Sequence, residues 1–164
     1  MANQVDDLIF VHAVTFEQLA EIRQLFLEYA ESLSFKLCFQ SFDAELNELP
    51  GKYAGPDGCL LLAAYRNEMA GCVGLRKLSD EICEMKRLYV RPRFHGLGIG
   101  KALIGEIVAE GRRKGYKHMR LDTVPSMATA IALYGKFGFR EIEAYCDNPI
   151  EGALYLELEL QPAT

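Results

Sequence analysis

Alternating and continuous runs of apolar residues divide much of the chain into predicted strands. Side chains of a strand point to opposite faces in turn, so a period of two, or a short continuous apolar run, is typical of one. The predicted strands are residues 8–14, 59–65, 69–78, 82–90, 118–124, 139–145 and 153–160. In the last of these, leucines alternate with Tyr155, Glu157 and Glu159, as in an antiparallel strand that is buried on one face.

Apolar residues spaced three or four positions apart predict helices between these strands. The predicted helices are residues 16–33, 41–49 and 99–115 and the segment between Ser126 and Gly138. Thr15 and Gln18 form a capping-box pattern at the start of the first helix. Ser126 is the expected N-cap of the last helix, and Gly138 is the residue that ends it.

The order of these elements is one strand, two helices, three strands, a helix, a strand, a helix and two strands. From this pattern we predict one mixed α/β domain over residues 1–164. The loosest segment, residues 50–58, contains five Gly or Pro residues and is too short to separate two domains.

Composition and charge restrict the class of protein. The chain of 164 residues is long enough to bury a sizeable core, and 50% apolar with 25% charged residues is ordinary for a globular protein. The net charge of −5 argues against nucleic acid as a main partner, because such partners are usually bound by a basic face. No apolar run reaches membrane-span length, and the amino terminus lacks a signal-peptide pattern. We therefore expect a soluble, cytoplasmic protein without a membrane partner.

The cysteines are scattered and have no Cys-x-x-Cys spacing, which indicates reduced thiols that mostly fill the core. They are Cys38, Cys59, Cys72, Cys83 and Cys146. His12 and His118 have no partners at a metal-binding spacing in the sequence. We therefore interpret both histidines as structural and expect no metal.

The segment from Leu88 to Ile104, LYVRPRFHGLGIGKALI, joins a predicted strand to a helix through closely spaced glycines. Glycine lets the backbone approach a ligand, and the first amides of a helix have no intrahelical acceptor. Together with the helix dipole, these amides favour an anion, most often a phosphate. The segment therefore predicts a site for a phosphate-bearing cofactor.

Two common phosphate-binding loops fit this segment poorly. A P-loop has Ser or Thr after its lysine, whereas Lys101 is followed by alanine. A dinucleotide fingerprint has the spacing Gly-x-Gly-x-x-Gly, whereas Gly96, Gly98 and Gly100 are each two positions apart. Asp122 stands near the place of the acidic residue of that fingerprint, but no βαβ repeat follows it.

The segment resembles instead the acyl-CoA loop of the GNAT superfamily of N-acetyltransferases. That loop has Gln or Arg, two residues, Gly, one residue, and Gly or Ala, after a strand that ends in an apolar run. In the register that we prefer, His95 takes the Gln/Arg position, Gly98 and Gly100 take the small positions, and Lys101 begins the helix. A shifted register with Arg93 at the first position also fits formally.

The order of elements is similar to the GNAT fold over nearly the whole chain. This resemblance implies a central, mostly antiparallel sheet flanked by helices. The segment ALYGKFGF, residues 132–139, resembles the junction between helix and final strands in the family. The resemblance further implies acetyl-CoA as cosubstrate and an amine acceptor on a small molecule or a protein. A homodimer stays open as the assembly.

The resemblance also implies how the cosubstrate is held. The pantetheine arm pairs with the strand backbone, and amides of the glycine turn hold the pyrophosphate, with His95 as a further donor. An exposed turn histidine is the alternative for His95. The predicted cofactor-binding residues are Leu88, Tyr89, Val90, His95, Gly96, Leu97, Gly98, Ile99, Gly100 and Lys101. Met127 stands where many family members have an Asn that contacts the arm.

Tyr134 is the candidate acid. Acetyl transfer to an amine needs a neutral amine and a protonated leaving thiol, and these groups titrate near ~10.4 and ~8.5. By the resemblance, Tyr134 in the segment LYGKFGF protonates the departing sulfur. The alternative is a core tyrosine, because Tyr134 shares a helix face with Met127 and Ile131.

Glu84 is the candidate base, directly or through a water. Many family members have a glutamate in the strand that leads to the glycine turn. Glu84 is expected on the same strand face as Leu88 and Val90, which would bring it toward the acetyl end of the site. The alternative is an exposed carboxylate paired with Lys86 or Arg87.

We therefore predict direct transfer of an acetyl group from acetyl-CoA to a primary amine in a ternary complex. The acceptor pocket is expected between the first two helices, their connection and the final strands. These regions contain Tyr29, Glu31, Phe35, Phe39 and Tyr145. A small metabolite, an amino acid, a polyamine and a protein amino terminus stay open as acceptors. The alternative from another class is a catalytically silent domain that binds acyl-CoA as a sensor or partner module.

Overall fold

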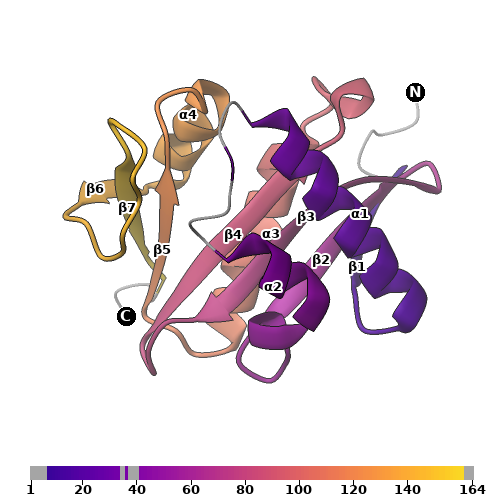
Figure 1. Cartoon of the computed structure of the whole chain (residues 1–164), viewed down its shortest axis with the longest axis horizontal. Coiled ribbons are helices and arrows are strands. Elements are labelled where there is room, and N and C mark those ends of the chain that lie inside the picture. Colours follow the sequence, from indigo (N-terminus) through magenta and orange to yellow (C-terminus); the bar gives the residue numbers. More distant parts are fainter. Residues whose placement is uncertain (1–6, 34–35, 37–40, 161–164) are drawn as a thin grey trace.

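The computed structural model describes residues 7–33, 36 and 41–160 of the chain. These residues form a seven-stranded sheet with helices on both faces (Figure 1). The strands are β1 Leu8–His12, β2 Cys59–Tyr65, β3 Glu68–Lys77, β4 Ile82–Val90, β5 His118–Thr123, β6 Arg140–Ile142 and β7 Leu154–Glu159. The helices are α1 Phe16–Ser32, α2 Phe42–Glu48, α3 Ile99–Arg113 and α4 Ala128–Phe137, with short 3-10 helices at Gly51–Tyr53 and Pro92–Phe94.

The strand order is β1-β2-β3-β4-β5-β7-β6. Neighbouring strands are antiparallel except β4 and β5, which run parallel. This confirms the predicted mixed α/β fold with a mostly antiparallel sheet. The pairing of β4 with β5 ends at Glu84 and Arg120. Beyond these residues the two strands diverge, as Figure 1 shows, and leave the backbone of β4 without a strand neighbour on that side.

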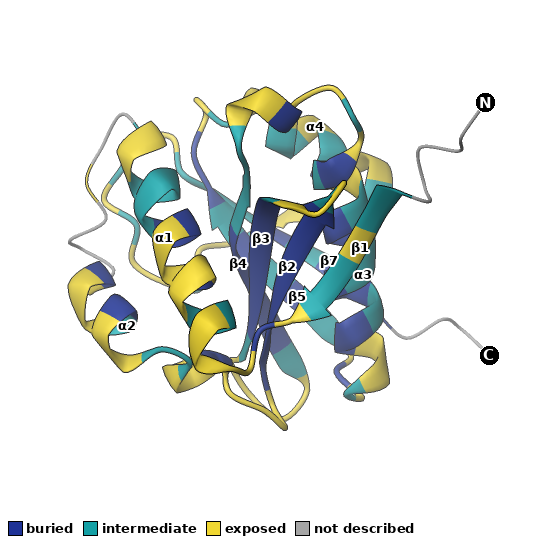
Figure 2. Ribbon diagram, turned by 90° about the vertical axis from the view of Figure 1, so that its right-hand side faces the viewer, coloured by how far each residue is buried: buried dark blue, intermediate teal, exposed yellow. Residues whose placement is uncertain are grey.

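Two hydrophobic cores lie on opposite faces of the sheet. Helices α1 and α2 pack on one face, where Leu25 and Leu62 have no exposed surface. Helix α3 packs on the other face, where Leu103 and Ala63 are equally buried. Consecutive residues of β2 thus pack into the two different cores in turn. Because both faces of the strand are buried, its sequence is a continuous apolar run. Figure 2 shows the middle of β2 and of β3 in dark blue, buried at the centre of the molecule.

Most predicted boundaries hold within two or three residues. The strands 59–65 and 82–90 are confirmed, and so is the capping box, in which the Gln18 amide donates to Thr15 Oγ1 at 3.2 Å. The prediction that Ser126 caps α4 is wrong. Met127 is the N-cap instead, because its amide closes a turn onto the carbonyl of Val124 at 3.0 Å before the helix begins.

The described cysteines are all free thiols, as expected. Cys59, Cys72 and Cys83 are buried, and Cys146 is exposed. Cys38 lies outside the described residues. In the part of the chain that the structure describes, the helices are too short or too polar for any of them to cross a bilayer.

Strand β4 contains one extra residue opposite β3. Cys72 pairs with Tyr89, whereas Gly74 pairs with Lys86, so one residue of β3 faces two residues of β4. Arg87, at this bulge, has a φ of 61°, in the left-handed region that is uncommon for residues other than glycine.

The bulge changes which side chains of β4 share a face. Met85 lies in the core beneath α3, and Leu88 and Val90 pack against the same core. Because the extra residue shifts the alternation by one position, Glu84 lies on the opposite face. The expectation that Glu84 shares a face with Leu88 and Val90 is therefore wrong.

Candidate active site

The turn before α3 presents backbone amides that have no acceptor inside the helix. Gly96 and Gly98 have φ angles of 82° and 79°, which glycine adopts without strain. The first intrahelical bond runs from the Ala102 amide to the carbonyl of Gly98 at 3.0 Å. The amides of residues 99–101, in the first turn of α3, therefore have no acceptor inside the helix and lie at its positive end. This geometry suits a phosphate group.

A groove of about 580 Å³ leads from this turn along β4. Residues 126–130 and Leu133, at the start of α4, form its opposite wall. It is lined by nine of the predicted cofactor residues, namely Leu88, Tyr89, Val90, His95, Gly96, Gly98, Ile99, Gly100 and Lys101. Leu97 is the exception, because its side chain packs against the hydrophobic core.

His95 braces the turn against the preceding strand. Its side chain is exposed, and Nε2 donates a hydrogen bond to the carbonyl of Val90 at 2.9 Å. This carbonyl belongs to the backbone where the pantetheine arm is predicted to pair. The imidazole therefore has a structural contact in addition to its predicted contact with a phosphate.

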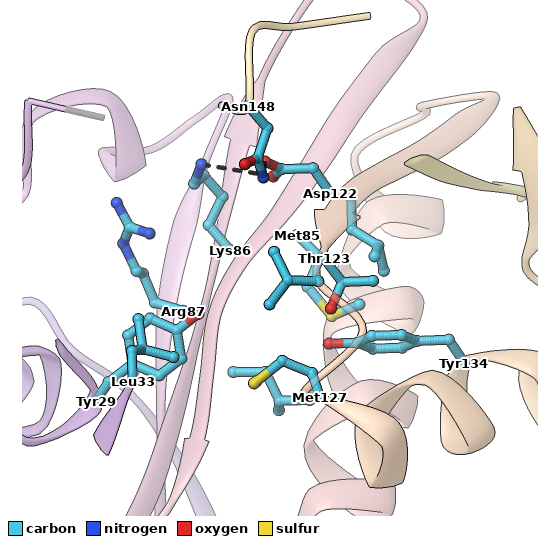
Figure 3. Close-up of a pocket in the computed structure, with 13 residues that line it drawn as sticks. Tyr29, Leu33, Met85, Lys86, Arg87, Asp122, Thr123, Met127, Tyr134 and Asn148 are labelled. Carbon is cyan, nitrogen blue, oxygen red and sulfur yellow. Dashed lines mark hydrogen bonds and ion pairs between the residues drawn. The ribbon is translucent and has the colours of Figure 1, made fainter. Parts of the chain in front are cut away.

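A smaller cavity of about 50 Å³ adjoins the groove. Tyr29, Leu88 and Met127 line both the groove and the cavity, so the two spaces lie side by side. The polar side chains of the smaller cavity are Tyr29, Lys86, Arg87, Asp122, Thr123, Tyr134 and Asn148 (Figure 3). A space of this size holds a few water molecules or the amine end of an acceptor.

Tyr134 lies in the wall of this inner cavity and is 6% exposed. Figure 3 shows its hydroxyl directed into the cavity, between Thr123 and Met127. Burial, reinforced by Tyr29 and Asp122, raises the pKa of Tyr134 well above that of an ordinary tyrosine. The hydroxyl therefore keeps its proton at neutral pH and has it available for hydrogen bonding in the cavity.

Glu84 is buried, with 1% exposure, and both of its oxygens accept hydrogen bonds. Arg76 Nε donates to Oε1 at 2.6 Å, and the Tyr145 hydroxyl donates to Oε2 at 2.5 Å. Desolvation, followed by the nearby Glu84 charge, raises the pKa of Tyr145 far above its usual range. Glu84 is not among the residues that line the inner cavity, so it reaches a bound amine only through a neighbour.

Lys86 connects Glu84 to a second carboxylate, Asp122. Its Nζ lies 4.0 Å from Glu84 Oε1 and 4.0 Å from Asp122 Oδ1. Desolvation lowers the pKa of Lys86, and the two carboxylates oppose that shift. Asp122 also accepts a hydrogen bond from Asn148 Nδ2 at 3.0 Å, and it lines the inner cavity.

Asp122 is the functional candidate that sequence reasoning missed. The sequence pattern indicates for it only the place of the acidic residue of a dinucleotide fingerprint. The available signal was a carboxylate at the end of a strand whose alternate residues, Met119, Leu121 and Thr123, are buried. Its proximity to Lys86 and Tyr134 depends on the divergence of β4 and β5, which the sequence pattern does not contain.

The residues expected around the acceptor are only partly assembled. Tyr29 lines both spaces, and Tyr145 contacts Glu84. Glu31 is exposed on α1 and lines neither space. Phe35 and Phe39 lie outside the described residues.

Comparisons of sequence assign the chain to a known family. The model of the acetyltransferase (GNAT) family matches residues 19–139. An uncharacterized N-acetyltransferase of Schizosaccharomyces pombe is 39% identical over 155 residues, which are 93% of this chain and 95% of that protein.

Solved structures show the same fold. An acetyltransferase of the GNAT family from Staphylococcus aureus has a TM-score of 0.77 at 18% identity, over 94% of this chain and 99% of that one. A GNAT family acetyltransferase from Elizabethkingia anophelis, with acetyl-CoA bound, has a TM-score of 0.64 at 24% identity, over 94% and 99% of the two chains. The predicted resemblance is thus confirmed by both kinds of comparison, and the chain belongs to the GNAT family of N-acetyltransferases.

Proposed function

We propose that the protein transfers an acetyl group from acetyl-CoA to a primary amine by direct attack, with both substrates bound together. The observation that carries this proposal is the adjacency of three features. Unpaired amides at the start of α3 lie at one end of the groove along β4, and the groove adjoins the inner cavity that Tyr134 lines. A molecule with a pyrophosphate at one end and a thioester at the other suits this arrangement. We further propose that residues 1–164 act as one domain.

Acetyl-CoA, in this proposal, lies along the groove. Its pyrophosphate accepts hydrogen bonds from the amides between Gly96 and Lys101, and His95 stands beside them. Its pantetheine arm pairs with the backbone of residues 88–90, as a peptide adds to an open sheet edge. Support comes from β4 itself, because its pairing with β5 ends at Glu84 and leaves that side of residues 88–90 without a strand neighbour.

The acetyl thioester supplies the acyl group, and Tyr134 acts on the leaving sulfur. Its hydroxyl donates a hydrogen bond to the sulfur while the carbon–sulfur bond breaks. Because the pKa of Tyr134 is raised, complete proton transfer to a thiolate near pKa ~8.5 is unfavourable at equilibrium. The contribution of Tyr134 is therefore largest in the transition state, where negative charge develops on sulfur.

Two carboxylates act on the amine, one in binding it and the other in accepting its proton. Asp122 lines the inner cavity and attracts the ammonium form of the acceptor. Glu84 is the final proton acceptor, and Tyr145 is the relay, because its hydroxyl already donates to Glu84. Tyr145 does not line the inner cavity, so a water carries the proton from the amine to its hydroxyl, and Tyr145 passes its own proton to Oε2 of Glu84. No charge is left on the tyrosine.

The direct test is release of free CoA from acetyl-CoA across a panel of amines. The panel should contain amino acids, polyamines, simple alkylamines and peptides with a free amino terminus, since each class stays open as an acceptor. We expect release that depends on the presence of one class. Binding of acetyl-CoA without amine-dependent release from any class would favour the alternative, a silent acyl-CoA-binding domain.

Gly100→Val should abolish or strongly weaken acetyl-CoA binding. Gly100 has ordinary helical geometry, and an added Cβ would meet only Leu133 and Val90, both at 3.8 Å, so the fold has room for a Cβ at this position. The two methyl groups of valine would then stand in the groove, ahead of the amides that hold the pyrophosphate. Loss of one hydrogen bond to a charged group, ~1.5–3 kcal/mol, corresponds to roughly 10–100-fold in affinity.

Calorimetry with acetyl-CoA measures this loss, and Gly135→Val is the matched control. Gly135 is also helical, and an added Cβ there meets no atom within 4 Å, but it does not line the groove. The control should bind acetyl-CoA normally. Unchanged binding in a folded Gly100→Val protein would show that the pyrophosphate lies elsewhere.

A further inference from the structure

Three side chains of types that bind metal ions lie close together near the edge strand β1, away from the groove along β4. His12 of β1, Cys59 of β2 and Glu110 of α3 each offer one ligand atom, and these atoms lie within 4.8 Å of one another. The residues are far apart in the sequence, so no spacing pattern indicated the cluster. The expectation that His12 is only structural therefore rested on sequence neighbours alone.

The distances suit a small divalent ion. His12 Nε2 and Glu110 Oε1 are 3.4 Å apart. In a tetrahedral zinc site, bonds of about 2.0–2.3 Å place neighbouring ligand atoms about 3.3–3.6 Å apart. The His–Glu edge of such a tetrahedron is thus already present. The Cys59 sulfur lies within 4.8 Å of the other two ligand atoms, so each of its distances needs to shorten by about 1.2 Å at most to reach about 3.6 Å.

The cluster is buried on one side and open on the other. The Glu110 side chain is 10% exposed and Cys59 is 7% exposed, whereas the His12 side chain is 53% exposed. An ion can therefore enter from solvent, and a water can complete its coordination. Arg113 opposes binding, because it forms an ion pair with Glu110, but its side chain is 60% exposed and such pairs contribute little.

We propose that His12, Cys59 and Glu110 bind a Zn²⁺ ion, with a water as the fourth ligand. On binding, the S–H bond of Cys59 breaks, the proton leaves to solvent and a Zn–S bond forms, without any oxidation or reduction. Zinc drives this exchange because a coordinated thiol is deprotonated outright. Without zinc, burial followed by the nearby Glu110 raises the pKa of Cys59 to about 12, so the group is then a neutral thiol.

The site would fasten the edge strand β1 to β2 and α3. Glu110 lies eleven residues after Ile99, which is about 16 Å along the helix from the glycine turn. The proposal therefore does not depend on the proposed acetyl transfer, and either can fail without the other. The competing interpretation is an ion pair between Glu110 and a protonated His12, with Cys59 as an unrelated core residue.

The test uses the full chain after dialysis against EDTA, titrated with ZnCl₂ by calorimetry. We expect one ion per chain and a higher melting temperature with zinc. Cys59→Ala and His12→Ala should each weaken binding by more than the ~10–100-fold that loss of an outer-shell partner costs. With Co²⁺ as the probe, a thiolate charge-transfer band should appear in the original protein and be absent in Cys59→Ala.

Two controls separate the zinc site from the ion pair. Cys72→Ala removes a buried cysteine that belongs to no group of possible metal ligands among the described residues, and it should leave zinc affinity and the Co²⁺ band unchanged. Arg113→Ala frees Glu110 and should tighten zinc binding by about 1.5–5-fold. Melting curves without metal verify that each variant folds. Equal zinc affinity in Cys59→Ala, or no saturable zinc binding in the original protein, would overturn the proposal.

Discussion

Replacing Tyr134 by phenylalanine should slow acetyl transfer by ~10²–10⁴-fold and leave acetyl-CoA affinity unchanged. The ring and its packing stay, so the only loss is the hydroxyl that faces the inner cavity. Because burial raises the pKa of Tyr134, the hydroxyl stays protonated through neutral pH. The ratio of variant to original rate should therefore be constant up to about pH 10, the ordinary tyrosine value.

Turnover and acetyl-CoA affinity should be measured on the same preparation. Tyr53→Phe is the matched control, because Tyr53 is also buried and its hydroxyl has no hydrogen-bond partner among the described residues. It lies in the core beneath α1 and α2 and should leave turnover unchanged. Unaltered turnover in Tyr134→Phe would make Tyr134 a core residue. Parallel loss of binding and turnover would point to packing.

Glu84→Gln should slow turnover most at low pH. An alkylammonium loses its proton near pH ~10.4, so the free amine becomes scarcer with every unit below that value. A base that removes the proton is therefore most valuable at neutral and acidic pH, where ~10²–10⁴-fold is typical. The defect should shrink as the pH approaches about 10. Rates across this range, at saturating acetyl-CoA, measure the effect.

Two variants separate proton transfer from damage to the buried charges. Loss of the Glu84 charge also leaves Arg76 and Lys86 with one carboxylate fewer, which is destabilising. Tyr145→Phe keeps all of these charges and removes only the proposed relay, so it should reproduce the pH trend. Asp122→Asn should raise KM without that trend. A constant rate ratio across pH in Glu84→Gln and Tyr145→Phe would reduce both residues to structural roles.

The position of Glu84 illustrates where sequence reasoning failed. A strict period of two places Glu84 with Leu88 and Val90. The apolar positions of β4 change phase between Met85 and Leu88, however, where Lys86 and Arg87 are two consecutive charged residues. The bulge at Arg87 breaks the period, because one residue of β3 faces two of β4. The two consecutive charged residues were the signal in the sequence, and the pairing of β4 with β3 shows that a bulge produces them.

The sequence by itself determined the features that depend on near neighbours. Apolar periodicity predicted the elements, Thr15 and Gln18 predicted the first helix cap, and Gly96 and Gly98 predicted the turn with free amides. Each of these features depends on interactions between residues a few positions apart, so a short segment of sequence is enough to predict it. The predicted cofactor-binding residues followed from the resemblance of this segment to the acyl-CoA loop, and all of them but Leu97 line the groove.

Only the tertiary structure decided what lies beside these features. The parallel pairing of β4 and β5 ends at Glu84, and the strands then diverge, which brings Asp122, Lys86 and Tyr134 around one cavity. Packing of α3 across β2, β3 and β4 likewise brings Glu110 beside His12 of the edge strand β1. These contacts join residues that are distant in sequence, and the free energy that creates them comes from burial of the whole core. No local pattern therefore contains them.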